Sequence, residues 1–253
     1  MFIGISFLLP FMAMASPRDH ADTSINGVLI SFSYQPSIFP DLWLTPEINA
    51  RGGRINETMT ASSISNISKA LSKYPAVILK ANIKAVYFLK WMKMYDVDFG
   101  ATNSFDAVYI TNDGPDQGYT DLYLEQSFHH EFSSILMRNY ISQLDTTAWK
   151  AANIPGFDYN DPEAGVGAIR NNESSQRIDS ALCSKGFLTQ YALSGMENDL
   201  NTLAQNIFNP DKGFWYAADH FWRIREKVKL LIRFYHKLDP RFTEKYFRAF
   251  DQH

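Results

Sequence analysis

The sequence predicts an α+β fold, in which a small, mainly antiparallel sheet packs on one long helix and a mostly helical part follows. Three short apolar runs, near 28–32, 83–90 and 107–111, have the length and composition of buried strands. From about residue 121 onward the apolar residues instead recur at three- and four-residue steps, which is the helical period. With 253 residues the chain is long enough to bury a substantial core.

The first half of the chain carries the predicted strands and one helix. Residues 62–74 place apolar side chains at helical spacing and end before Pro75, a common end for a helix. The aromatic run 83–95 and the strand 107–111 are separated by a turn at Phe99–Thr102, so we expect these two strands to form a hairpin.

The second half is predicted to be helical. Residues 121–144 form one long amphipathic helix, and a loop of about 40 residues follows it. A second helix runs from about Glu197 to Phe208 and ends at Asn209–Pro210. Residues 214–250 are largely helical, with a break at Asp239–Pro240.

The N-terminus indicates export. Residues 1–15 are apolar apart from Ser6 and close on an Ala-x-Ala pattern, which is typical of a secretory signal peptide and too short for a membrane span. We therefore expect a signal peptide at 1–15, a secreted or periplasmic protein, and one domain over 16–253. That domain divides into an α/β part, about 16–145, and a helical part, about 180–253.

Composition narrows the function. Lys and Arg number 24 against 27 Asp and Glu, and the chain has no long basic run, so nucleic acid is not an expected partner. The lone Cys183 excludes a cysteine-rich zinc site, which leaves His, Asp and Glu as metal ligands. The six histidines are therefore the main candidates for metal ligands.

The long helix contains part of a zinc-peptidase motif. In His-Glu-x-x-His, two imidazoles one turn apart bind the metal and the Glu activates water. Here His130 and Glu131 occupy the first two positions, and Ser134 stands where the second histidine belongs. His129 cannot replace it, because adjacent residues point about 100° apart around a helix. From these residues alone, an incidental histidine pair is the alternative to a metal site.

The wider chain resembles the zinc-binding metallopeptidases of bacterial envelopes, which are gluzincin-like proteins with His-Glu-Phe-x-His-Ile-Leu on the active-site helix. The resemblance covers roughly residues 62–250 and rests on five segments: Phe99–Thr102, Val108–Ile110, FHHEFSSIL at 128–136, Gly186–Ala192 and Glu197–Asp199. It implies a zincin-like fold whose helical C-terminal part forms the second wall of a cleft.

The resemblance also implies site residues. Zinc would be held by His130 together with Glu197 or Asp199, Glu131 would be the general base, and Tyr191 would assist at an oxyanion. The two acids equally fit helix capping, because both fall in the first turn of the predicted helix. His220, within an aromatic stretch, is a possible replacement ligand, although a histidine at the edge of the core is the simpler interpretation.

Three functions follow. The first is a secreted zinc metallopeptidase, a hydrolase acting on peptide or protein substrates. The second is a catalytically inactive, metallopeptidase-like binding or scaffold protein of the cell envelope, which Ser134 favours directly. The third is a metal-free protein in which the histidine pair is incidental. Convergence of His130, Glu131 and one of the acids on one point would distinguish the third from the others.

Overall fold

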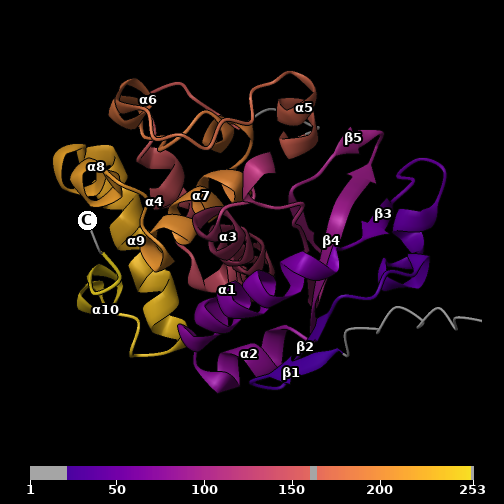
Figure 1. Ribbon diagram of the computed structural model, residues 1–253. Helices are drawn as coiled ribbons and strands as arrows, with labels where there is room; N and C mark the ends of the chain where they lie inside the picture. Colours follow the sequence, from indigo (N-terminus) through magenta and orange to yellow (C-terminus); the bar gives the residue numbers. More distant parts are fainter. Residues whose placement is uncertain (1–21, 160–163, 252–253) are drawn as a thin grey trace, which may run out of the picture.

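The computed structural model describes residues 22–159 and 164–251 (Figure 1). The predicted signal peptide at 1–15 lies outside these residues. Among the described helices, none is both long and apolar enough to cross a membrane.

One open sheet forms the first half of the molecule, with strand order β1-β2-β4-β7-β6. The long central strand β4 pairs in parallel with β2 and β7 through its first half, and its second half pairs antiparallel with β3 and β5. The strands are β1 Thr23–Ile25, β2 Val28–Ser31, β3 Arg51–Arg54, β4 Ala85–Met94, β5 Val97–Asp98, β6 Ala101–Asn103 and β7 Ala107–Thr111.

The predicted hairpin between 83–95 and 107–111 is wrong, because β4 and β7 run parallel. The short β6 enters between them along the chain and pairs antiparallel with β7 at the end of the sheet. The three predicted strands correspond to β2, β4 and β7, and β4 pairs in parallel with the other two. The antiparallel pairs of the sheet are formed with β1, β3, β5 and β6.

Side-chain alternation along the strands gives the sheet two buried faces. Val86, Phe88, Val108 and Ile110 point toward the helices and belong to the main core. The opposite face packs against the segment around Phe39, which supplies the 3₁₀ turns η1 Pro36–Ile38 and η2 Asp41–Leu44.

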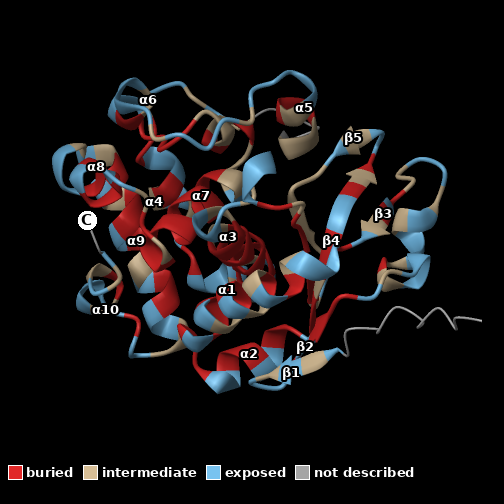
Figure 2. Ribbon diagram, in the orientation of Figure 1, coloured by how far each residue is buried: buried red, intermediate tan, exposed pale blue. Residues whose placement is uncertain are grey.

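The helix α3, Asp121–Tyr140, lies at the centre of the molecule (Figures 1 and 2). Thr120 caps its first turn by accepting a hydrogen bond from the Tyr123 N–H. Its apolar side, which includes Phe128 and Phe132, enters the main core beside α1, Thr60–Ser72. Its polar side is also buried, because α7 packs over it. The predicted amphipathic helix is thus enclosed on both sides.

The C-terminal part is helical, as predicted. A 3₁₀ turn, η6 Tyr191–Ser194, leads into α7, which packs on α3. The loop predicted after α3 contains short helices of its own. The remaining helices are α2 Ala76–Asn82, α4 Thr146–Ala151, α5 Ala164–Arg170, α6 Ser180–Lys185, α7 Met196–Phe208, α8 Phe214–His220, α9 Trp222–Leu238 and α10 Glu244–Arg248. The α+β architecture predicted from the sequence is confirmed.

Candidate active site

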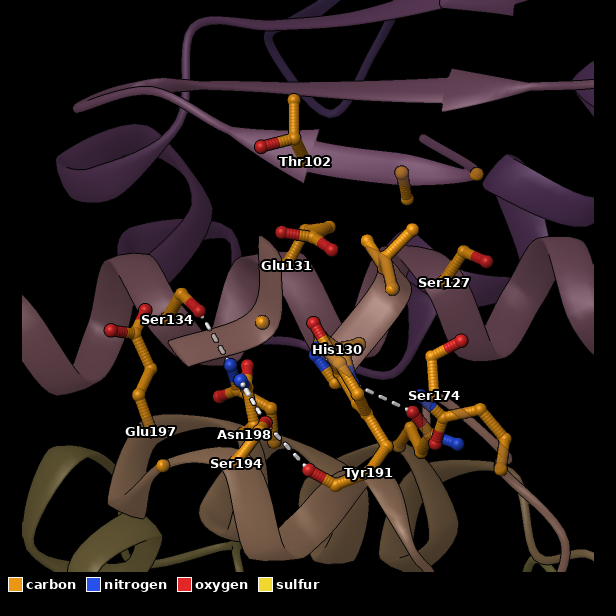
Figure 3. Close-up of a pocket in the computed structure, with 18 of the residues that line it drawn as sticks. Thr102, Ser127, His130, Glu131, Ser134, Ser174, Tyr191, Ser194, Glu197 and Asn198 are labelled. Atoms are coloured by element: carbon orange, nitrogen blue, oxygen red, sulfur yellow. Dashed lines mark hydrogen bonds between the residues drawn. The ribbon is translucent and has the colours of Figure 1, made fainter. Parts of the chain in front are cut away.

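A pocket of about 830 Å³ lies between the edge strand β6, the helix α3 and the start of α7 (Figure 3). Residues 98–103 form one wall as a continuous run. The wall opposite comes from η6 and α7, and α5 borders the pocket through Gly165, Val166 and Ile169. Of the predicted site residues, the structure brings four to this pocket: His130, Glu131, Tyr191 and Glu197.

His130 is held in one tautomer. Its Nδ1 lies 2.8 Å from Oε1 of Gln205, which can only accept, so Nδ1 carries the proton. The other ring nitrogen, Nε2, is then a lone-pair acceptor, and no described residue donates to it. Burial lowers the pKa of His130 to about 4, although the Gln205 hydrogen bond opposes that shift. The ring is therefore neutral at pH 7 and bordered by the Tyr191 ring, 5.9 Å away between centroids.

Glu131 is oriented by the edge strand. Its Oε2 accepts a 2.7 Å hydrogen bond from Nδ2 of Asn103, whose Oδ1 in turn accepts from Arg138. Burial raises the pKa of Glu131 to about 7, and the Glu197 carboxylate adds to the rise, while the hydrogen bond from Asn103 and the charge of Arg138 oppose it. A carboxyl with this pKa exchanges protons near neutral pH, which suits a general base or acid.

Tyr191 and Glu197 form the far side of the pocket. Glu197 is solvent-exposed at the start of α7, and among described residues its carboxylate has no hydrogen bond or ion pair. Tyr191 lies close to α5, since a Cβ added at Gly165 would meet the Tyr191 hydroxyl at 2.4 Å. Burial raises the pKa of Tyr191, and the charges of Glu131 and Glu197 raise it further. Its phenol is therefore a neutral donor at physiological pH.

Ser134 lies in the same pocket but is already engaged. Ser134 faces the pocket (Figure 3), and its Oγ accepts a hydrogen bond of 2.5 Å from Nδ2 of Asn201. Both side chains are buried. The position where the family motif has a second imidazole is thus occupied by a hydrogen-bonded pair joining α3 to α7.

Asp199 is not brought to the pocket. It is fully buried on the other side of α7 and forms a 2.6 Å ion pair with Lys227 of α9. The same carboxylate oxygen accepts hydrogen bonds from Trp149 and Tyr159. Asp199 therefore does not face the pocket as a metal ligand would. It instead links α7 to Trp149, Tyr159 and Lys227.

His220 is also away from the pocket. It is exposed on α8, stacks on Tyr216 with centroids 3.9 Å apart, and donates a 2.9 Å hydrogen bond from Nδ1 to the Tyr216 carbonyl. His220 is not among the residues that line the pocket, so it does not replace the missing imidazole there.

The residues present do not fit a zinc centre. Structural and catalytic zinc sites use three or four ligands drawn from His, Cys, Asp and Glu. Within residues 22–159 and 164–251, no group of three such side chains is placed to hold an ion. One imidazole, the hydrogen-bonded carboxylate of Glu131, the exposed carboxylate of Glu197 and a serine hydroxyl bonded to Asn201 make a weak donor set.

Sequence reasoning missed three amides that define the site: Asn103, Asn201 and Gln205. A signal for two of them was present, because Glu197, Asn201 and Gln205 follow one another at four-residue steps and so share one face of α7. Asn103 carried no comparable signal, since its role depends on where β6 lies relative to α3.

Comparisons with known proteins place the fold. No protein-family model and no curated protein sequence matches the chain. Among solved structures, the chain is similar to a crystal structure from Bacteroides caccae described as a "putative zinc-binding metallo-peptidase". The TM-score is 0.52 at 14% sequence identity, over 79% of this chain and 77% of that chain. At this identity the likeness shows a metallopeptidase-like fold.

Proposed function

We propose that this protein is a catalytically inactive, metallopeptidase-like binding protein, whose cleft holds peptide segments without zinc. The observation that carries this proposal is the hydrogen bond from Asn201 to Ser134, at the position where the related motif has its second histidine. A zinc ion would need an imidazole there, and the Ser134 hydroxyl is instead held by Asn201 without a metal.

The edge strand supports peptide as the ligand class. Thr111 donates to the Gly100 carbonyl and Ser104 donates to the Ala107 carbonyl, which fixes residues 100, 102 and 104 as the hydrogen-bonded positions facing β7. The backbone N–H and C=O groups of Ala101 and Asn103 therefore point away from β7. No other described strand pairs with β6.

Such an edge binds an extended peptide as one more strand, because alternate backbone groups are available to it. Ala101 and Asn103 lie in the pocket wall, so the added strand would pass over Glu131 and His130. The pocket would then recognise one of its side chains or its end.

The test is peptide binding with the metal removed. Peptides selected from a random heptapeptide library in the presence of EDTA should bind equally well before and after addition of zinc. N-methylation of alternate peptide nitrogens should abolish binding in one register and leave it within about twofold in the other, because only one register faces β6. Loss of all binding in EDTA would contradict the proposal.

A zinc metallopeptidase is the second candidate. The tautomer of His130, with Nε2 free of donors, and the pKa of Glu131 near 7 both suit a metal ligand and a general base. This hypothesis expects near-stoichiometric zinc in dialysed protein, and casein cleavage that is abolished by Glu131→Gln without loss of the fold. If dialysed protein contained no zinc and did not cleave casein, the peptidase hypothesis would be rejected and the binding-protein hypothesis retained.

Ser134→His tests the geometry shared by both candidates. An imidazole at this position would stand one turn from His130, with Glu197 across the pocket, and zinc affinity should rise at least a hundredfold. Ser134→Ala, which adds no ligand, is the matched control. An unchanged affinity in Ser134→His would mean that the pocket has departed from zinc-site geometry altogether.

Location at the cell envelope is part of the proposal. It rests on the signal-peptide pattern of residues 1–15. N-terminal sequencing of the exported protein should give a chain that starts at Ser16.

A further inference from the structure

Several donors that line the pocket are already bonded to the protein itself. Four amide side chains in the lining have spent an N–H on the protein itself: Asn103 on Glu131, Gln126 on the Asn209 carbonyl, Asn198 on Ser194 and Asn201 on Ser134. The ammonium of Lys150, also in the lining, lies 3.5 Å from the carboxylate of Asp158. One N–H of each of these amides is therefore engaged by the protein itself.

The acceptors, by contrast, remain free. His130 is 7% exposed and its Nε2 lone pair has no donor among the described residues. The exposed carboxylate of Glu197 has no hydrogen bond or ion pair among the described residues. A buried acceptor without a donor is unfavourable, so a ligand that supplies N–H groups would be stabilised here.

Charge points the same way. Glu131 and Glu197 border the pocket from α3 and from α7 (Figure 3), and the charge of Glu197 acts on Glu131. Arg138 engages Asn103 and the Ser104 carbonyl, on the strand side of Glu131. Among the described residues, neither carboxylate forms an ion pair with a lysine or arginine.

We infer that the pocket binds a primary ammonium group of a peptide ligand, held between Glu131 and Glu197 with His130 Nε2 as an additional acceptor. An ammonium carries three N–H donors and no acceptor, which complements two carboxylates that form no ion pair among the described residues and an imidazole nitrogen without a donor. The inference rests on the proposed peptide-binding function and specifies what that site recognises. It places a ligand cation in the region where a related enzyme would hold a metal cation.

Two sources supply this group, a lysine side chain and a free peptide N-terminus. Three peptides separate them: acetyl-Ala-Lys-Ala-amide, Ala-Ala-Ala-amide with a free N-terminus, and acetyl-Ala-Ala-Ala-amide, which has no ammonium. Binding of each to the full chain is measured by calorimetry in EDTA at pH 8. We expect at least one ammonium peptide to bind ten times more tightly than the blocked peptide, and the tighter of the two identifies the source.

Glu197→Gln should remove most of this preference, lowering the affinity of the ammonium peptide about tenfold while leaving that of the blocked peptide within twofold. Glu226→Gln, the same change at a half-buried residue of α9 that lies outside the pocket and pairs with Lys229, is the control and should change neither.

Equal binding of all three peptides would overturn the ammonium inference and leave the peptide-binding function in place. Absence of binding by any of the three would overturn both. Retention of the full preference in Glu197→Gln would also overturn the inference, because the carboxylate pair would not be the recognition element.

Discussion

Two glutamates on one helix, Glu125 and Glu131, have opposite environments. Both are buried on α3, at 1% and 9% exposure. Glu125 is bonded to the ammonium groups of Lys73 and Lys69, and its Oε1 lies 3.5 Å from Nε2 of His129. Glu131 has one neutral amide donor and faces a second carboxylate.

The pKa values follow these surroundings. Burial by itself raises the pKa of Glu125, but hydrogen bonds from His129, Lys69 and Lys73 outweigh it and lower the pKa to about 2. Burial raises the pKa of Glu131 to about 7, and nothing outweighs it. Glu125, whose charge is compensated by two lysines, links α3 to the C-terminal end of α1. Glu131, whose charge is not compensated, lines the pocket. An unbalanced buried charge thus marks the site better than burial alone.

The largest expected effect is at the compensated glutamate. Glu125→Gln would leave the buried ammonium of Lys73 without its partner, which typically costs about 3–5 kcal/mol of folding free energy. Urea unfolding at pH 7 measures it. The double variant Glu125→Gln with Lys73→Met should recover much of the loss, and failure to do so would mean that the ion pair is not the reason.

The opposite sign is expected at Glu131. Its folded pKa of about 7 exceeds the ordinary value of 4.5, so ionisation destabilises the folded state as pH rises through this window. Glu131→Gln should therefore increase the free energy of unfolding by about 3 kcal/mol at pH 8 and leave it unchanged near pH 4. A destabilised variant at pH 8 would contradict the assignment of an uncompensated charge.

The dependence of stability on pH sharpens the comparison. Burial lowers the pKa of His129 and of His130 to about 4, so the unfolded chain takes up two protons that the folded chain refuses as pH falls below 6.5. Glu131 acts in the reverse direction, because its folded carboxyl takes up one proton in the same range. Two protons bound by the unfolded chain outweigh this one, so the wild type should lose stability as the pH falls from 6.5 to 4.5. In Glu131→Gln this opposing proton uptake is lost, so the free energy of unfolding should fall more steeply with decreasing pH, by about 1.4 kcal/mol per pH unit.

The smallest effect on stability is expected at Glu197. Its side chain is exposed and has no described partner, so Glu197→Gln should change the free energy of unfolding by less than about 0.5 kcal/mol. The contrast with its effect on ammonium binding is the useful result. A large loss of stability would indicate a structural role instead.

Local patterns in the sequence were enough to find the elements. The strands 28–32, 83–90 and 107–111 and the helices around 121–144 and 197–208 all appear near their predicted bounds, because period and turn residues are local properties. Strand direction was not local. β4 and β7 are parallel because the chain between them forms β6 at the sheet's edge, and no spacing rule anticipates that.

The choice between Glu197 and Asp199 shows the same division at the site. Two residues apart on a helix, their side chains point about 200° apart, so only one can face the pocket. The sequence could state that exclusion. Which of them faces α3 depends on how α7 packs between α3 and α9. Asp199 lies at the interface with α9, where it pairs with Lys227.

By itself, the sequence determined the fold class, the helix that carries His130 and Glu131, and the absence of a second imidazole at Ser134. Only the tertiary structure decided what replaces that imidazole, because Asn201 and Gln205 reach Ser134 and His130 across 67 and 75 residues of chain. Contacts between such distant residues depend on how whole helices pack, whereas residue identity and helical period are readable in any short window.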